Sequence, residues 1–265
     1  MPRERFGEQH TFLPRRAYLS FSEIEKVVLA CKPLGLEKVR ITGGEPLLRP
    51  DLHELISKIS TTGLEVALTT NASLLSKQAA KLAEAGLDRV TVSLDALDPE
   101  VHSQMTDSST PVEAVLDGID AALEAGLTPL KVNCVVQRGV NETEVAPLVR
   151  HFRGTGVTVR FIEYMDVGRT NGWHSGQVVP SADLLAHLQG EFDLTPLDSE
   201  RPSDVARRWA HADGSGEIGV ISSVSEPFCG GCVRARLSAD GMLHTCLFAS
   251  GGHDLRAIIH NGAEG

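Results

Sequence analysis

Hydrophobic runs and amphipathic segments alternate along the first part of the chain. Five runs rich in β-branched residues lack a polar alternation, which is typical of parallel strands buried on both faces. The segments between them carry apolar residues at helical spacing. The predicted strands are Lys38–Ile41, Leu64–Leu68, Arg89–Val92, Leu130–Val136 and Val157–Ile162. Strands that alternate with helices in this way predict right-handed βαβ units and a parallel α/β sheet or barrel.

Capping residues predict where several helices begin. Ser20 and Glu23 have the spacing of a capping box, and Asp51 and Glu54 repeat it. Asn141 is a candidate cap for a later helix, although a proline falls inside that helix.

Beyond about residue 170 the sequence becomes rich in turns. The segments 213–216 and 239–241 have the composition of hairpin turns. We therefore expect residues 1–170 to form the barrel and residues 171–265 to form an extension packed against it.

Composition and charge narrow the class of protein. The 265 residues are 42% hydrophobic and 23% charged, as expected of a globular chain with a core. The net charge of −10 argues against binding to nucleic acid or to anionic membranes. No apolar run approaches the length of a transmembrane helix, and Met1–Gly7 lacks the apolar core of a signal peptide. We expect a cytoplasmic protein.

The ends of the predicted strands carry the first candidate site. In parallel α/β folds, ligands bind at the carboxyl ends of the strands. After the first strand comes Gly43-Gly44-Glu45-Pro46, in which two glycines let a ligand approach the backbone and Glu45 can accept a bond from a ligand amine. Taken alone, this tetrapeptide fits an ordinary turn better. Arg40 and Lys131 lie near strand ends and can reach the same ligand.

Three of the five cysteines form a second candidate site. Cys229, Cys232 and Cys246 crowd into one short stretch, which indicates a reduced compartment and a metal site rather than disulfides. Thiolates two residues apart can hold one metal centre from a single turn. An iron–sulfur cluster and a structural zinc, with His244 or His253 as fourth ligand, both fit this spacing.

Two arginines follow the second cysteine directly. On an extended strand, Arg234 and Arg236 project from the same face, beside the metal site. Their guanidinium groups suit a triphosphate, because arginine binds phosphate with two parallel bonds. A pair of solvated surface arginines is the alternative. Cys31 and Cys134 stand alone and are predicted to be core residues.

With these residues in view, the chain resembles the MoaA family, the radical SAM enzymes known as GTP 3′,8-cyclases, which perform the first step of molybdenum-cofactor synthesis. The resemblance runs through essentially the whole chain. The stretches that carry it are Phe12–Arg15, Arg40–Arg49, Thr69–Asn71, Thr91–Asp95, Pro227–Cys232, Arg234–Leu237, Asp240–Gly241, Cys246–Phe248 and Asp254–Arg256.

The resemblance implies a fold and a set of contacts, but it identifies no catalytic residue. The implied fold is a partial, TIM-like parallel βα barrel of radical SAM type, with a C-terminal extension that carries the three-cysteine site. The residues implied to bind S-adenosylmethionine are Gly44, Ser93 and Met165. Those implied to bind GTP are Arg40, Thr69 (or its neighbour Thr70), Lys131, Arg234, Ala235 and Arg236. The three cysteines would hold a 4Fe–4S cluster that binds GTP through its open iron.

The resemblance also implies a reaction and partners. In the family, a 5′-deoxyadenosyl radical abstracts a hydrogen from the ribose of GTP, and the purine C8 is joined to that carbon. The product, (8S)-3′,8-cyclo-7,8-dihydroguanosine 5′-triphosphate, passes to a cyclic pyranopterin monophosphate synthase. A homodimer is a further expectation.

The chain departs from the family pattern in two ways. The N-terminal CxxxCxxC motif, whose 4Fe–4S cluster reduces S-adenosylmethionine, is absent, and Met1-Pro2 matches the Met-Pro that follows it in the family. We therefore expect a truncated start, a missing first barrel strand, an unpaired sheet edge with poor solubility, and no cleavage of S-adenosylmethionine. Val233 replaces the polar residue that usually follows the second cysteine of the C-terminal site.

Two other functions fit parts of the pattern. One is a different radical SAM protein with an auxiliary cluster, such as a peptide-modifying enzyme. The arginines after Cys232 and the Phe12–Arg15 segment argue against it. The other is a pseudoenzyme that binds a nucleotide or zinc.

Overall fold

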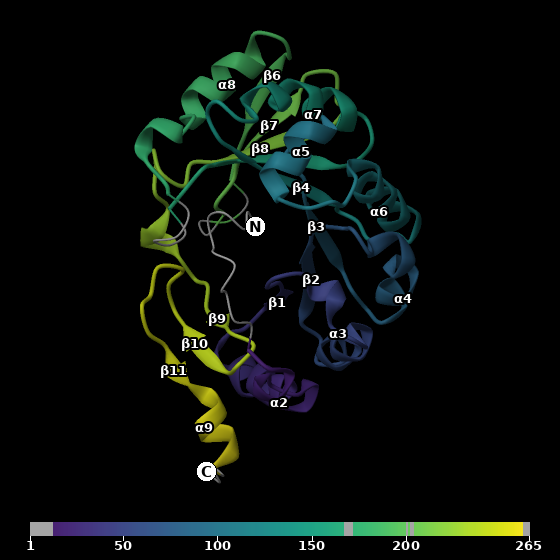
Figure 1. Ribbon diagram of the computed structural model, residues 1–265, viewed down its shortest axis with the longest axis vertical. Coiled ribbons are helices and arrows are strands. Elements are labelled where there is room, and N and C mark those ends of the chain that lie inside the picture. The colour runs from purple at the N-terminus through teal and green to yellow at the C-terminus, as the bar shows by residue number, and fades with distance from the viewer. Residues whose placement is uncertain (1–12, 167–171, 200, 202–203, 262–265) are drawn as a thin grey trace.

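A curved sheet of eight strands organises the molecule (Figure 1). The computed structural model describes residues 13–166, 172–199, 201 and 204–261, so the Met1-Pro2 match and Phe12 lie outside the described residues. The strand order is β1-β2-β3-β4-β5-β8-β7-β6. The strands are β1 (Lys38–Ile41), β2 (Glu65–Thr70), β3 (Arg89–Ser93), β4 (Lys131–Val136), β5 (Thr158–Glu163), β6 (Leu194–Leu197), β7 (Arg207–His211) and β8 (Glu217–Ile221). Because β1 to β5 and β8 run parallel, the expected parallel α/β architecture is confirmed.

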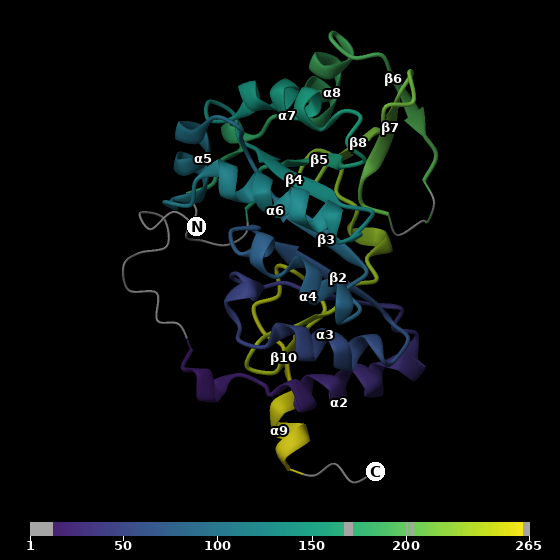
Figure 2. The ribbon, with the colours of Figure 1, turned by 90° about the vertical axis from the view of Figure 1, so that its right-hand side faces the viewer.

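Helices cover the outer side of the curved sheet (Figures 1 and 2). They are α2 (Phe21–Cys31), α3 (Leu52–Ser60), α4 (Ala79–Glu84), α5 (Pro99–Thr106), α6 (Val112–Glu124), α7 (Val145–Phe152) and α8 (Ser181–Gln189). The last helix, α9 (Leu255–His260), lies at the end of the C-terminal segment instead. Short 3-10 turns lie at Arg15–Ala17, Lys32–Leu34, Pro46–Leu48, Leu75–Lys77, Glu142–Glu144, Ser175–Gln177 and Cys229–Gly231. No helix among the described residues combines the length and apolar character needed to cross a bilayer.

The core lies between these helices and the outer face of the sheet. In β4 the even-numbered side chains Val132, Cys134 and Val136 are fully buried, whereas Lys131 and Asn133 are only half-buried. In β2 and β3, by contrast, residues 66–68 and 90–92 are buried without a break. The sequence expectation of strands buried on both faces therefore holds for β2 and β3, whereas the inner face of β4 is polar.

The helix caps match the sequence expectation in one case of three. Ser20 and Glu23 form the capping box at the start of α2. Asp51 precedes α3 with a left-handed backbone (φ 55°), which keeps its side chain from capping, because a capping residue needs extended dihedrals. Asn141 is fully buried, and its amide bonds Asp95 O and Val135 O instead of a helix end. Pro147 is tolerated because α7 starts at Val145, and a first-turn N–H has no partner within the helix.

The sheet continues past residue 170. Strand β8 pairs in parallel with β5, and β7 and β6 follow as an antiparallel edge. The predicted turn at 213–216 joins β7 to β8 and is confirmed. The division into 1–170 and 171–265 stays a prediction, but it does not coincide with a boundary of the sheet.

The C-terminal part forms a small antiparallel sheet, β11-β10-β9, of β9 (Arg236–Leu237), β10 (Met242–His244) and β11 (His253–Asp254). Its predicted turn at 239–241 is confirmed, with Gly241 at φ 93°. In Figures 1 and 2 the segment from β8 to α9 crosses the open side of the curved sheet. It is fastened near α2, where Leu19 N donates to Ala239 O (2.7 Å) and Arg256 Nη1 donates to Ala17 O (2.7 Å).

A close approach between α6 and the turn after β2 provides a test of the packing. A Cβ atom at Gly118 would lie 2.6 Å from the backbone oxygen of Ala72. We expect Gly118→Ala to lower the free energy of unfolding by about 1–3 kcal/mol through overpacking. This loss exceeds the gain of about 1 kcal/mol that alanine brings to a helix interior. Urea unfolding measures the change, with Asp117→Ala on the exposed face as control, and a stabilised Gly118→Ala variant would contradict the packing.

Candidate functional site

The inner face of the sheet carries a cluster of polar side chains. Arg40 in β1 donates from Nη1 to Thr69 Oγ1 (3.0 Å) and to Thr91 Oγ1 (3.1 Å). The strand register aligns Thr69 with Thr91 and Thr91 with Lys131. Three residues that the sequence assigned to one ligand, Arg40, Thr69 and Lys131, therefore lie on one face of the four neighbouring parallel strands β1 to β4.

Three members of this cluster were not among the predicted ligand-binding residues. They are Thr91, Asn133 and Arg160. Arg160 in β5 donates from Nε to Asn133 Oδ1 (2.9 Å), and the two residues are register partners. The sequence contained a sign of this for Arg160. It stands between the apolar Val159 and Phe161, which are buried, and alternate residues of a strand face opposite sides of the sheet.

The inner face is positively charged. Burial, together with the nearby charge of Arg40, lowers the pKa of Arg160 to about 10. Burial also lowers the pKa of Arg40 and of Lys131, and for Lys131 the charge of Arg160 adds to the effect. None of the ion pairs among the described residues includes these three cations. Glu65 and Glu217 partly offset the charges of Arg40 and Lys131 from a distance. A group of three cations without ion pairs among the described residues, in a protein of net charge −10, still suits a polyanionic ligand.

The residues predicted to bind S-adenosylmethionine share one edge of the sheet. Gly44 follows β1, Ser93 ends β3 and Met165 follows β5. No atom of the described residues, apart from the chain neighbours, lies within 4 Å of a Cβ placed on Gly43 or Gly44, so packing among these residues leaves the space over this backbone open.

Glu45 has a different role from the one expected of it. Its Oε1 accepts from Leu47 N (3.0 Å) and Thr70 Oγ1 (2.7 Å), and its Oε2 accepts from Asn71 N (2.7 Å). The carboxylate ties the loop after β1 to the end of β2. A ligand amine bound to Glu45, as the sequence suggested, would have to share the two carboxylate oxygens with these three donors.

The three clustered cysteines lie on the segment that crosses the open side of the sheet. All three are exposed, and Cys229 and Cys232 flank a tight turn closed by Cys232 N and Cys229 O (3.2 Å). Hydrogen bonds from the backbone and side chain of Arg234 lower the pKa of Cys232, which favours the thiolate that a metal needs. Cys246 follows β10, and its sulfur accepts from Phe248 N (3.4 Å).

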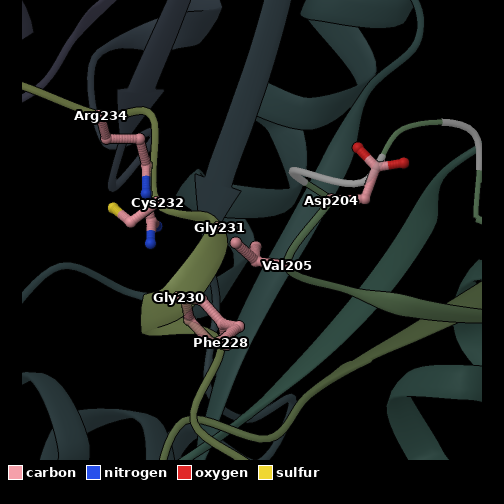
Figure 3. Close-up of a pocket in the computed structure, with 7 residues that line it drawn as sticks. All are labelled: Asp204, Val205, Phe228, Gly230, Gly231, Cys232 and Arg234. Atoms are coloured by element: carbon pink, nitrogen blue, oxygen red, sulfur yellow. The ribbon is translucent and has the colours of Figure 1, made fainter.

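A pocket of about 170 Å³ lies beside Cys232 (Figure 3). It is lined by Asp204, Val205, Phe228, Gly230, Gly231, Cys232 and Arg234.

The sulfur atoms are spread more widely than the ligands of a single ion. Among the described residues, the set of three potential ligands whose ligand atoms lie within 4.8 Å of one another is Asp51, His53 and Glu54, and the cysteines form no such set. Ligands around one zinc ion sit closer than that, because each Zn–S bond is about 2.3 Å.

The two arginines after Cys232 have different surroundings. The strand β9 begins at Arg236, so Arg234 lies outside it, and the shared strand face expected of the pair is not formed. Arg234 is exposed, with its guanidinium 5.2 Å from the ring centre of Phe228. One guanidinium nitrogen of Arg236, Nη1, is buried and has no hydrogen-bond partner among the described residues. A buried donor of this kind calls for an acceptor. Ala235 between them is exposed.

Asp95 gives this edge of the sheet a dependence on pH. Its Oδ1 accepts from Val135 N (2.8 Å), and burial raises its pKa from 3.8 to about 6. The folded protein thus binds a proton more tightly than the unfolded chain, and stability is lost as the pH rises between these two values.

We expect Asp95→Asn to raise the free energy of unfolding at pH 8 by about 1–3 kcal/mol, and to have no such effect near pH 4. Urea unfolding across this range measures it, with Asp120→Asn as control, and a gain that does not change with pH would refute the assignment.

Comparisons with known proteins give consistent matches along essentially the whole chain. Residues 5–152 match the model of the radical SAM superfamily, and residues 157–265 match Molybdenum Cofactor Synthesis C. A GTP 3′,8-cyclase of Xanthomonas axonopodis pv. citri is 52% identical over 264 residues, which are 99% of this chain and 79% of that protein. One from Acidothermus cellulolyticus is 48% identical over 100% of this chain and 74% of its own length. The solved structure of Streptococcus suis SuiB bound to S-adenosylmethionine is similar in fold, with a TM-score of 0.66 and 14% identity over 89% of this chain and 56% of that chain.

Proposed function

Because the chain belongs to the GTP 3′,8-cyclase family of radical SAM enzymes, we propose that it binds GTP between the inner face of its sheet and its C-terminal cysteine segment. The family acts in molybdenum-cofactor biosynthesis, and radical SAM proteins use a 4Fe–4S cluster and S-adenosylmethionine. The observation that carries the proposal is a group of three cations on the inner face that form no ion pair among the described residues: Arg40, Lys131 and Arg160.

The triphosphate is the part of GTP that these cations suit. Arginine binds phosphate oxygens with two parallel hydrogen bonds, and a site that is partly shielded from water strengthens each of them. The buried Nη1 of Arg236 is a donor that lacks an acceptor among the described residues, and a phosphate oxygen would supply one. Thr69 and Arg234 are further proposed contacts, and Ala235 offers its backbone. Together they hold the nucleotide in one orientation.

S-adenosylmethionine is proposed to lie along the carboxyl edge, at Gly44, Ser93 and Met165. The open space over Gly43 and Gly44 supports this, because a ligand can approach that backbone without displacing protein atoms. Bound there, it would sit at the rim of the same inner face that carries Arg40 and Thr69.

A cluster fits the three cysteines better than zinc does. A 4Fe–4S cluster spreads its ligands over several iron atoms, and the sulfur atoms of Cys229, Cys232 and Cys246 are not gathered around a single point. When bound, this cluster would supply an open iron site, whereas the radical chemistry of the family needs S-adenosylmethionine together with the cluster of the CxxxCxxC motif. The residues of the chain would orient the ribose and the purine of GTP as the family's reaction requires, in which C3′ is joined to C8 to give (8S)-3′,8-cyclo-7,8-dihydroguanosine 5′-triphosphate.

The proposal separates binding from turnover. The printed sequence contains no CxxxCxxC, and its remaining cysteines lie on different elements, Cys31 at the end of α2 and Cys134 inside β4. Burial raises the pKa of the Cys134 thiol well above its usual range, so it is a poor metal ligand. We propose that a polypeptide of these 265 residues binds GTP and one cluster but does not cleave S-adenosylmethionine. Transfer of product to a cyclic pyranopterin monophosphate synthase, a homodimer and a cytoplasmic location stay predictions.

Anaerobic purification followed by metal and ligand analysis tests the proposal. We expect iron and sulfide rather than zinc, and a rise in melting temperature with GTP that ATP does not reproduce. With dithionite and S-adenosylmethionine we expect no 5′-deoxyadenosine. Zinc in place of iron would favour the pseudoenzyme. A cluster without any effect of GTP would favour a different radical SAM protein, such as a peptide-modifying enzyme.

A further inference from the structure

We infer that Glu163 is a positioning residue, which fixes the segment leading from the sheet to Cys229. Glu163 is the last residue of β5 and is only 3% exposed. The inference deepens the proposed function, because that segment carries the proposed cluster ligands.

Both carboxylate oxygens of Glu163 are occupied. Oε1 accepts from Ser181 N (2.7 Å) and from Ser225 Oγ, and Oε2 accepts from Val224 N (2.7 Å) and Ser225 N (2.8 Å). Burial by itself would raise the pKa of Glu163, but the bonds from Ser225, Val224 and Ser181 outweigh it and the pKa lies below its ordinary value. The group is therefore an ionised acceptor whose partners are mostly backbone N–H groups, which cannot rotate away.

The segment that Glu163 holds has few other attachments. After β8 ends at Ile221, the backbone-to-backbone bonds of described residues 224–235 are limited to Cys232 N and Cys229 O. Glu226 pairs with Arg207, but both side chains are more than half exposed (53% and 69%), and such pairs contribute little. The buried carboxylate is thus the firm anchor of this stretch, four residues before Cys229.

The same carboxylate joins two sites. Met165, a proposed S-adenosylmethionine contact, lies two residues after Glu163 on the same strand end. Ser225 lies four residues before Cys229. A change at Glu163 alters the distance between these two groups without touching either ligand. Outer residues that orient metal ligands commonly alter metal affinity by about 10–100-fold when they are replaced.

Glu163→Gln is the sharpest test, because it keeps the shape and removes one acceptor. In either orientation its amide NH₂ faces donor groups, either Ser181 N–H with the Ser225 hydroxyl, or the N–H groups of Val224 and Ser225. We expect the variant to lose its iron roughly tenfold more readily to a chelator. We also expect faster amide hydrogen exchange over residues 222–232.

Glu144→Gln is the matched control. Glu144 is also buried, at 9% exposure, and also accepts two backbone N–H groups, from Leu97 (2.8 Å) and Asp98 (3.0 Å). It holds the loop after β3 rather than the cysteine segment. We expect Glu144→Gln to lower the melting temperature about as much as Glu163→Gln does. We expect its iron retention and its amide hydrogen exchange over residues 222–232 to equal those of the unmodified protein.

The outcomes are distinct. Unchanged exchange over residues 222–232 in Glu163→Gln would overturn the inference, and so would an equal loss of iron in both glutamine variants. If the unmodified chain holds no iron, the proposed cluster fails, whereas the exchange measurement still decides whether Glu163 fixes the segment.

Discussion

Replacing Arg160 by methionine is expected to stabilise the ligand-free protein and to weaken GTP binding by about 10–100-fold. The guanidinium is shielded from water, and its pKa of about 10 reports a charge that is costly to keep beside Arg40. Methionine removes that charge and fills similar space, so the free energy of unfolding should rise by about 1–2 kcal/mol after allowance for solvent screening. The weaker binding follows from the loss of a charged hydrogen bond, worth about 1.5–3 kcal/mol.

Melting temperature without ligand and calorimetric titration with GTP measure the two effects of Arg160→Met. Arg150→Met is the control for charge, because Arg150 pairs with Glu191 on the exposed side of α7. Unchanged GTP affinity in Arg160→Met would remove this residue from the proposed site. A lower melting temperature without ligand would show that its bond to Asn133 outweighs the repulsion.

Replacing Cys232 by serine is expected to remove nearly all of the iron. A serine hydroxyl stays protonated where the thiol of Cys232, its pKa lowered by Arg234, supplies a thiolate. With two cysteines left, we expect less than about a tenth of the iron per chain, because metal affinity depends on the full ligand set. Since Cys232 is exposed, the fold itself should be unaffected.

Iron analysis and melting temperature separate the Cys232 effect from general damage. Cys134→Ser is the matched control, since Cys134 is fully buried in β4. We expect that variant to keep its iron and to lose about 1–3 kcal/mol of stability. The buried sulfur contacts Asp95 O (3.6 Å) and Asn141 Nδ2 (3.7 Å), and these distances are too long for the hydrogen bonds of a hydroxyl. Equal iron in Cys232→Ser and the unmodified chain would dismiss the three-cysteine site.

The sheet was largely predictable because local pattern specifies it. The strand Lys38–Ile41 was predicted with its observed bounds, and the other four differ by one or two residues at an end. Strand β8 was not predicted, since its pairing with β5 is set by contacts between segments far apart in the chain. The turn before it, at 213–216, was legible because turns depend on adjacent residues.

The site was only partly predictable, for a related reason. Arg40 and Lys131 were predicted from their place near strand ends, although the structure puts Arg40 inside β1 and Lys131 at the amino end of β4. Arg160 lies inside β5, where only its inward direction marks it. Glu45 was considered as an acceptor for a ligand amine because its partners, Thr70 and Asn71, come from a neighbouring strand that the motif does not reveal. Arg234 and Arg236 look equivalent by spacing, but the backbone becomes extended only at the second of them.

The fastening of the C-terminal segment near α2 has a consequence for the life of the protein in the cell. The bond from Arg256 to Ala17 joins positions 239 apart, and closing a flexible loop of that length costs about 5 kcal/mol. We expect this contact to form late, after the sheet has brought the two segments together. Molecules caught before this step would have a finished sheet and an unfastened cysteine segment, which proteases can cut.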